Sequence, residues 1–245
     1  MLRPADYPLP GEYQTAYADA DSLFFETDID AMNKPETQRA ALQKLMYTDG
    51  RTLEAVLNDE AYNALSQYIE KVGLPMMLLQ NMKPGMLMST LELLEFQILG
   101  FTPQGVDAHF HQRASVDGKA IGFFETVEVQ VAILAEMGKG EESDFVLLSL
   151  RDLERIENDI ESIIDDWRSG NAELLMQHFV ADMKEATPDV YQSLLEDRND
   201  NWMPEIEAML DDADTEFVLV GVAHLIGQDG IVQQLRGRGY QIEQL

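Results

Sequence analysis

Short apolar runs at three widely separated places in the chain predict β-strands. They cover residues 22–25, 120–124 and 217–220. The third run is continuous and rich in β-branched residues, which is typical of a buried strand in a parallel sheet. A helix at 231–238 and a last strand at 240–243 are predicted after it, so the C-terminal part reads as a βαβ unit.

Between the first two predicted strands the pattern is helical throughout. Segments near 35–47, 51–57, 59–72, 74–82 and 85–99 are separated by glycine and proline. Further helices are predicted at 11–20, from 105 onward, at 143–168, 171–185 and 188–197, with 198–204 leading into a last stretch at 205–210. No repeat or linker divides the chain. We therefore predict one α/β domain over 1–245, with a mostly parallel central sheet flanked by helices and a helical insertion at about 34–100.

Methionines crowd the second half of this insertion. Methionines at helical spacing fill an adaptable core or line a groove for apolar side chains, and core filling is the commoner role. They are Met76, Met77, Met82, Met86 and Met88. Because the insertion directly follows the first strand, we expect it to form a lid over one sheet edge, with these side chains facing a groove.

The charge and composition of the chain exclude several classes of partner and of functional site. The chain has 45 acidic against 17 basic residues and a net charge of −28, which argues against nucleic acid and anionic membrane surfaces as partners. It has no cysteine, so disulfides, thiolate metal sites and a cysteine nucleophile are excluded. The apolar runs are shorter than the roughly 18 residues that span a bilayer, and residues 1–6 contain no apolar stretch of signal-peptide type.

Polar residues follow each predicted strand at its carboxyl end. Glu26 and Glu125 end the first two strands, and His224 lies three residues beyond Gly221, which ends the third. Sites in parallel α/β sheets form outside the carboxyl ends of the strands, so we expect these side chains to converge at one sheet edge. Solvated strand-end acids and a histidine that caps a loop are the alternative, and both interpretations stay open.

Four further residues are candidates for supporting roles. Asp107 lies in the first turn of a predicted helix, where a carboxylate also suits the helix dipole. Gln130 is on the helix after the second strand and can point at the sheet end. Arg198, followed by Asn199, leaves the end of a predicted helix, where pairing with the abundant acids is the ordinary role.

Taken in order, these motifs resemble the TraB/GumN family, which includes the Tiki-type metalloproteases, and more widely the erythromycin-esterase-like and ChaN-like α/β proteins. The resemblance covers nearly the whole chain. The matching pieces are Tyr7-Pro-Leu-Pro10, Ser22-Leu-Phe-Phe-Glu26-Thr-Asp28, Gly105-Val-Asp107, Gly118-Lys119, Phe124-Glu125-Thr126 with Gln130, Arg198-Asn199 with Trp202, and Gly221-Val-Ala-His224-Leu with Gly227 and Gly230.

The family is marked by two Gly-x-x-His motifs, of which Gly221 to His224 matches the second. The first has no counterpart here. We therefore expect the given sequence to be truncated, starting just after that motif and lacking one strand and one histidine, and to be impaired by that loss.

The resemblance implies a divalent-metal-dependent hydrolase, most closely a peptidase that acts on a peptide or protein substrate. Manganese, cobalt or zinc would be the ion. His224 would be a ligand, Glu26 and Glu125 would be ligand and general base in an order left open, and Arg198 would stabilise the developing oxyanion. Asp107, Gln130 and Asn199 would support them. The resemblance also favours a periplasmic or otherwise exported location.

Two other functions remain open. One is a non-catalytic binding or interaction protein on the same fold. The other is haem or iron binding of the ChaN-like kind, which rests on fold-level similarity alone.

Overall fold

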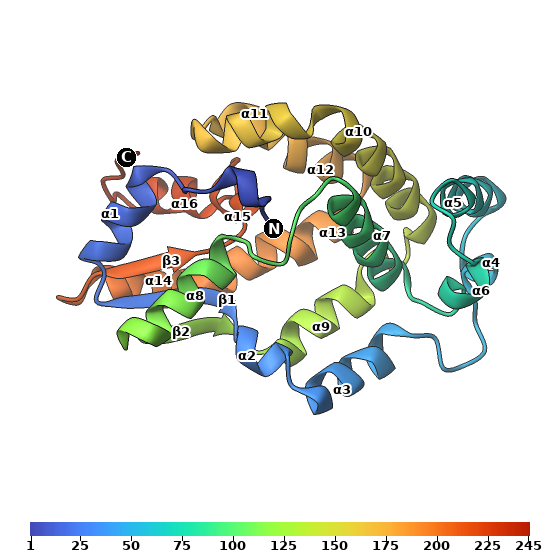
Figure 1. Ribbon diagram of the computed structural model, residues 1–245, viewed down its shortest axis with the longest axis horizontal. Coiled ribbons are helices and arrows are strands. Elements are labelled where there is room, and N and C mark those ends of the chain that lie inside the picture. The colour runs from blue at the N-terminus through green and yellow to red at the C-terminus, as the bar shows by residue number, and fades with distance from the viewer.

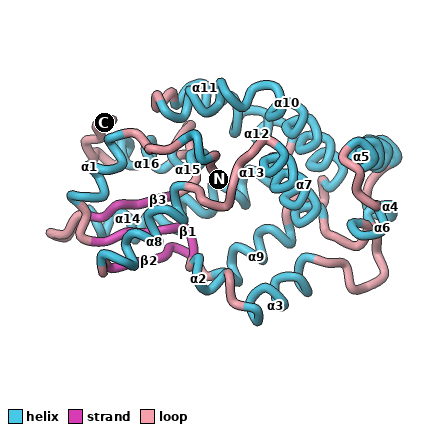
Figure 2. Tube along the Cα trace, viewed as in Figure 1, coloured by secondary structure: helices cyan, strands magenta, loops and turns pink.

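The three predicted strands form one all-parallel sheet in a computed structural model that describes all 245 residues. The strands are β1 (Ser22–Thr27), β2 (Ala120–Glu125) and β3 (Glu216–Leu219), in the order β2-β1-β3. Phe24 of β1 lies opposite Gly122 of β2 and Val218 of β3. Since helices cover both faces of this sheet, the predicted α/β class is confirmed (Figures 1 and 2).

Successive residues of β1 point to opposite faces of the sheet. Leu23 and Phe25 are buried in a cluster with Phe110 of α8 (Val106–Asp117), on the face that α1 (Gly11–Asp19) also covers. Phe24 instead contacts Phe124, whose ring stacks on Trp202 of α14 (Asp197–Leu210) on the other face. Because side chains alternate along a strand, Glu26 follows Phe24 to the α14 face.

The strand predicted at 240–243 does not form. Helix α16 (Ile231–Gly237) is present as predicted, but the Tyr240 N–H bonds back to the carbonyl of Leu235. Four residues later, Gln244 donates to the carbonyl of Gly170. The chain end is thus bonded to α16 and to the turn between α10 and α11, and its backbone makes no ladder with the sheet. The terminal βαβ unit is therefore incomplete.

The helical insertion builds a second and larger core together with α10 (Glu142–Arg168). Helices α5 and α7 pack on α10, while α3 and α7 pack on α9 (Val127–Glu136). The insertion contains α2 (Ile29–Met32), α3 (Pro35–Leu45), α4 (Leu53–Val56), α5 (Asp59–Lys71), α6 (Met76–Leu79) and α7 (Pro84–Ile98). Figure 1 shows this part of the chain beside the sheet, at the end where β1 and β2 finish.

The segment at 198–204, predicted to follow the end of a helix at 197, is itself helical. The backbone runs without a break through α13 (Pro188–Tyr191), the π-helical turn η3 (Gln192–Glu196) and α14. The sequence Arg-Asn-Asp-Asn is poor in helix formers, but Arg198, Asn199 and Trp202 are buried, so tertiary packing outweighs local propensity. Arg198 therefore lies inside a helical run instead of leaving one.

The remaining elements are short. They are η1 (Pro4–Asp6), α11 (Ala172–Met176), η2 (Gln177–Ala181), α12 (Asp182–Ala186) and α15 (Val222–Leu225). None of the helices combines the length and the apolar character needed to cross a bilayer.

The methionines of the insertion divide between the two predicted roles. Met76 and Met82 pack against the helical core, Met86 lines a cavity that also contains Glu26, and Met88 does both, because it is buried in the helical core at the cavity wall. Met77 does neither, because it is 75% exposed on the short helix α6.

We predict that Gly85→Ala destabilises the helical part. A Cβ at this position would lie 2.1 Å from the carbonyl oxygen of Leu134, so α7 and α9 could no longer approach as closely as they do. Overpacking of this kind costs about 1–3 kcal/mol, measurable as a lower midpoint in urea unfolding. Gly11→Ala is the control, because a Cβ there would meet nothing within 4 Å. Equal stability of the two variants would contradict the close helix contact.

Candidate functional site

The guanidinium of Arg198 bonds three strand-end side chains at once. Its Nη2 lies 2.7 Å from a carboxylate oxygen of Glu26. Its Nε and Nη2 donate to the two carboxylate oxygens of Glu125 at 2.9 and 3.0 Å. Its Nη1 lies 3.0 Å from Nε2 of His224. The structure thus brings together the three residues that the sequence placed at one sheet edge, with Arg198 between them.

Each of the three partners lies at or just beyond the carboxyl end of a different strand. Glu26 is in β1, Glu125 is the last residue of β2, and His224 is in α15, immediately after β3. The side chains of Arg198 and Glu125 are 8% and 7% exposed, but that of Glu26 is 26% exposed. Glu26 is therefore the acid through which this cluster meets solvent.

The hydrogen bonds of His224 determine its tautomer. An arginine can only donate, so Nε2 must accept from Arg198 and the ring proton must be on Nδ1. Nδ1 then donates to Oδ1 of Asn199 at 2.7 Å. The amide nitrogen of Asn199 donates to the carbonyl of Asp229 at 3.0 Å, which leaves Oδ1 as the acceptor. Asn199 thus holds His224 in one orientation.

His224 is neutral at physiological pH. The residue is 3% exposed, and burial lowers the pKa of its imidazole to about 4. The charge of Glu26 opposes this shift, and that of Arg198 adds to it. A neutral ring is what the bond from Arg198 requires.

Gly221 and Arg198 both donate hydrogen bonds to the carboxylate of Glu26. The Gly221 N–H donates to Glu26 at 2.7 Å, and a Cβ on Gly221 would lie 3.3 Å from the same oxygen. Burial alone raises the pKa of Glu26, but the positive charge of Arg198 and the hydrogen bonds from Arg198 and the Gly221 N–H hold it below its usual value. Glu26 is therefore ionised at neutral pH. The Gly-x-x-His spacing places a backbone donor and an imidazole on either side of one turn.

Trp202 belongs to the site, although we did not predict it as a site residue. Its Nε1 donates to Glu125 at 2.9 Å. Its ring centroid lies 4.4 Å from that of His224 and 4.8 Å from the guanidinium carbon of Arg198. Positions 198 and 202 are four apart on one helix and share a face, which is the signal that could have found it.

The two other predicted supporting residues are less closely held. Gln130 donates to Glu26 at 3.4 Å, a long hydrogen bond. Asp107 makes no hydrogen bond or ion pair with the cluster, although burial and the charge of Glu26 raise the pKa of its carboxyl. Asp107 is thus near the site without contacting it.

The donor chemistry of the cluster suits a divalent metal, but its arrangement does not. Carboxylate oxygens and an imidazole nitrogen whose Nδ1 proton is held by a neighbour are donors that zinc accepts. Here their facing atoms all bond the guanidinium of Arg198. No group of three or more acidic or histidine side chains is placed to hold a metal ion. A cation is already at the centre of this donor set.

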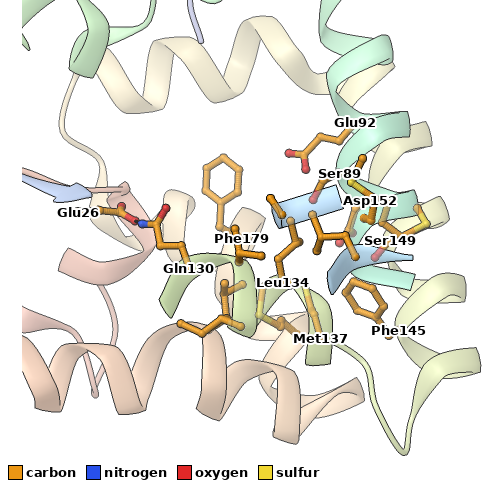
Figure 3. A pocket seen from close by; sticks show the side chains of 18 of the residues that line it. Glu26, Ser89, Glu92, Gln130, Leu134, Met137, Phe145, Ser149, Asp152 and Phe179 are labelled. Atoms are coloured by element: carbon orange, nitrogen blue, oxygen red, sulfur yellow. Dashed lines mark hydrogen bonds between the residues drawn. The ribbon is translucent and has the colours of Figure 1, made fainter. Parts of the chain in front are cut away.

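A cavity of about 900 Å³ leads away from the cluster. Glu26 and Arg198 form part of its wall, and most of its other lining residues are apolar. Figure 3 shows Glu26 and Gln130 at one end, with Leu134, Met137 and Phe179 between them and the opposite wall. The helical insertion thus forms one wall of a cleft that opens onto the cluster, through α3 and α7.

A model of the TraB/PrgY/gumN family matches residues 1–244 of the chain. Comparison with curated proteins and with solved structures gave no match.

We predict that Arg198→Met is strongly destabilising at neutral pH and less so in acid. It leaves Glu26 and Glu125 without their counter-charge, which for a buried pair costs about 3–5 kcal/mol. Because the folded-state pKa of Glu26 is lowered, the stabilisation by Arg198 is present at neutral pH and is lost as pH falls through that pKa. Thermal unfolding between pH 3 and 7 measures both effects.

Arg51→Met is the matched control, since the Arg51–Asp49 ion pair has more than half of both side chains exposed. Its effect should stay within about 1 kcal/mol. A loss in Arg198→Met that does not change with pH would contradict the ionic origin of the stabilisation.

We predict that NMR of the His224 ring shows a proton on Nδ1 at neutral pH and a titration midpoint near 4. Since the unfolded ring binds its proton near pH 6.5, stability should fall as pH falls from about 6.5 toward 4. Asn199→Asp places a carboxylate beside Nδ1 and should move the midpoint upward. A midpoint near 6.5 in the unaltered protein would contradict the buried, neutral ring.

Proposed function

The chain belongs to the TraB/PrgY/gumN family, and on this basis we propose that it is a hydrolase that cleaves amide bonds in peptides or proteins. The observation that carries the proposal is the position of the Glu26–Arg198 pair. A carboxylate that is ionised at neutral pH and a guanidinium lie together in the wall of a large apolar cleft. A general base and a fixed positive charge are the two groups that attack by water on an amide requires.

Glu26 supplies the base in this proposal. A water beside its carboxylate loses a proton to Glu26 as its oxygen bonds the carbonyl carbon of the substrate, and the carbonyl becomes an oxyanion. Protonation removes the charge that binds Glu26 to Arg198, so the Nη2 of Arg198 is released toward the oxyanion. The oxyanion then re-forms the carbonyl as the C–N bond breaks, and the proton on Glu26 passes to the nitrogen of the leaving amine, which restores the Glu26 carboxylate and releases the acid product.

The other members of the cluster keep Arg198 in place during this exchange. Glu125 holds two of its nitrogen atoms and is itself fixed by the Trp202 N–H. His224, oriented by Asn199, holds the third. The guanidinium is therefore oriented before substrate arrives, which lowers the reorganisation needed to stabilise an oxyanion.

The resemblance also implies a divalent ion, which the arrangement of the donor set does not fit. Because Arg198 occupies the centre of the donor set, no step of the proposed reaction passes through a metal. Metal dependence is therefore part of the test below.

A second candidate is a non-catalytic binding protein. The observation that favours it is that Glu26, Glu125, Arg198 and His224 all have hydrogen-bond partners within the chain, without any ligand. A fully satisfied polar network stabilises a fold by itself. In that case a partner molecule would bind in the cleft, and the cluster around Arg198 would have only a structural role at one end of the cleft.

We predict that a peptide library incubated with the protein yields defined cleavage products by mass spectrometry. Glu26→Gln should lower the rate about 10²–10⁴-fold, the usual contribution of a general base. Asp30→Asn is the matched control, because Asp30 is an exposed acid nearby in the chain that makes no ion pair. Thermal unfolding checks that both variants are folded.

The same assay with EDTA, and with added manganese, cobalt or zinc, tests the role of a metal. We expect cleavage to survive EDTA, since Arg198 already provides the positive charge. Activity that requires the ion would show that the guanidinium leaves the donor set, and would overturn its assigned role. Absence of cleavage under every condition would favour the binding protein.

A further inference from the structure

The end of the cleft opposite Glu26 carries a second group of polar side chains. Ser89 and Glu92 come from α7, and Ser149 and Asp152 come from α10. Figure 3 shows them facing Glu26 across the apolar part of the cavity. The two ends therefore belong to one continuous space.

Glu92 has no partner in the chain. It forms neither an ion pair nor a hydrogen bond, and its side chain is exposed within the cavity. Protein surrounds it closely enough that burial, followed by repulsion from Asp152, raises the pKa of its carboxyl. The Nη1 atom of Arg155 lies 3.7 Å from a carboxylate oxygen of Asp152. The same atom lies 2.8 Å from a carboxylate oxygen of Asp182, so Asp182 is its closer partner. Asp152 is thus partly neutralised by Arg155, which also lines the cavity, whereas Glu92 adds a negative charge that the chain itself does not neutralise.

The surface between the two ends is apolar and partly uncovered. Leu134, Met137 and Phe179 face the cavity there. On its rim, Leu42 is 51% exposed and Met32 is 40% exposed. Each Å² of such surface removed from water stabilises a complex by roughly 25 cal/mol, so an apolar ligand would be favoured along this stretch.

We propose that the cleft binds an extended peptide segment whose apolar side chains cover this surface and whose lysine or arginine side chain reaches Glu92 and Asp152. Charge complementarity and the continuity of the cavity with Glu26 identify this occupant. The proposal rests on the proposed function, because it takes the Glu26 end as the place where the peptide is cut. Binding itself does not require cleavage.

A long basic side chain fits this end better than a small cation does. Lysine and arginine have aliphatic stems that pack on apolar surface while the charged group reaches polar partners. The hydroxyls of Ser89 and Ser149 lie beside the two carboxylates and can accept further N–H donors. A free amino terminus of a peptide has the same positive charge but no aliphatic stem. The experiment below distinguishes an amino terminus from a basic side chain.

The test measures binding of N-acetylated apolar octapeptides by isothermal titration calorimetry. One peptide has a single lysine, and its partner has norleucine, the neutral analogue of similar length, at the same position. We expect the lysine peptide to bind about tenfold more tightly, which corresponds to about 1.4 kcal/mol. The preference should shrink in high salt and as pH falls through the raised pKa values of Glu92 and Asp152.

The double variant Glu92→Gln, Asp152→Asn should lose this preference. Glu154→Gln is the control, because Glu154 is exposed on α10 but lies outside the cleft. Equal binding of the two peptides by the unaltered protein would overturn the proposal, whatever the variants do. Equal loss of preference in the control would overturn it as well. A norleucine peptide with a free amino terminus that binds as tightly as the lysine peptide would overturn the assignment to a side chain.

Mass spectrometry of the same mixtures separates this proposal from the proposed function. Tighter binding of the lysine peptide without any cleavage would support the proposed peptide ligand and contradict the proposed hydrolase activity. If both peptides bind with equal affinity and are cleaved at equal rates, the result would support the hydrolase activity and contradict the proposed binding of a basic side chain.

Discussion

The bonds of Arg198 hold together elements that the chain brings from four distant places. Removing a guanidinium and a carboxylate from water is costly unless each finds partners of good geometry. Glu125 gives Arg198 two parallel bonds, and Glu26 and His224 receive the others. The edge of the sheet, α15 and α14 can therefore be buried against one another only in the arrangement that keeps this set complete.

The position of the cluster follows from strand alternation and from one helical face. In β1, the side that Phe24 presents to α14 is the side on which Glu26 emerges. In α14, Arg198 and Trp202 are one turn apart, so the same face supplies the cation and the indole that fixes Glu125. The site thus needs little irregular backbone beyond the Gly221 turn, whose N–H bonds Glu26.

The sequence was informative where local pattern decides structure, and uninformative where distant partners do. The strands and their terminal acids could be predicted, because apolar runs mark buried strands wherever they lie. The segment 240–243 has a strand-like composition, but strand formation requires a free neighbour, and the chain end is held by Leu235 and Gly170. The helical state of Arg198 was missed for the same reason, since its burial depends on residues far away in the chain.

The two ends of the cleft differ in whether their charged side chains have partners within the chain. At one end each charge is matched within the chain, so that end can preserve its geometry unaided. At the other end, the carboxylate of Glu92 lies in the cleft without a partner in the chain, and a ligand of opposite charge would neutralise it. The net charge of −28 acts in the same direction, because a strongly negative field raises the local concentration of cations and speeds their approach. Long-range attraction and the local position of Glu92 thus favour the same basic partner, while the apolar surface between the ends sets how the rest of that partner lies.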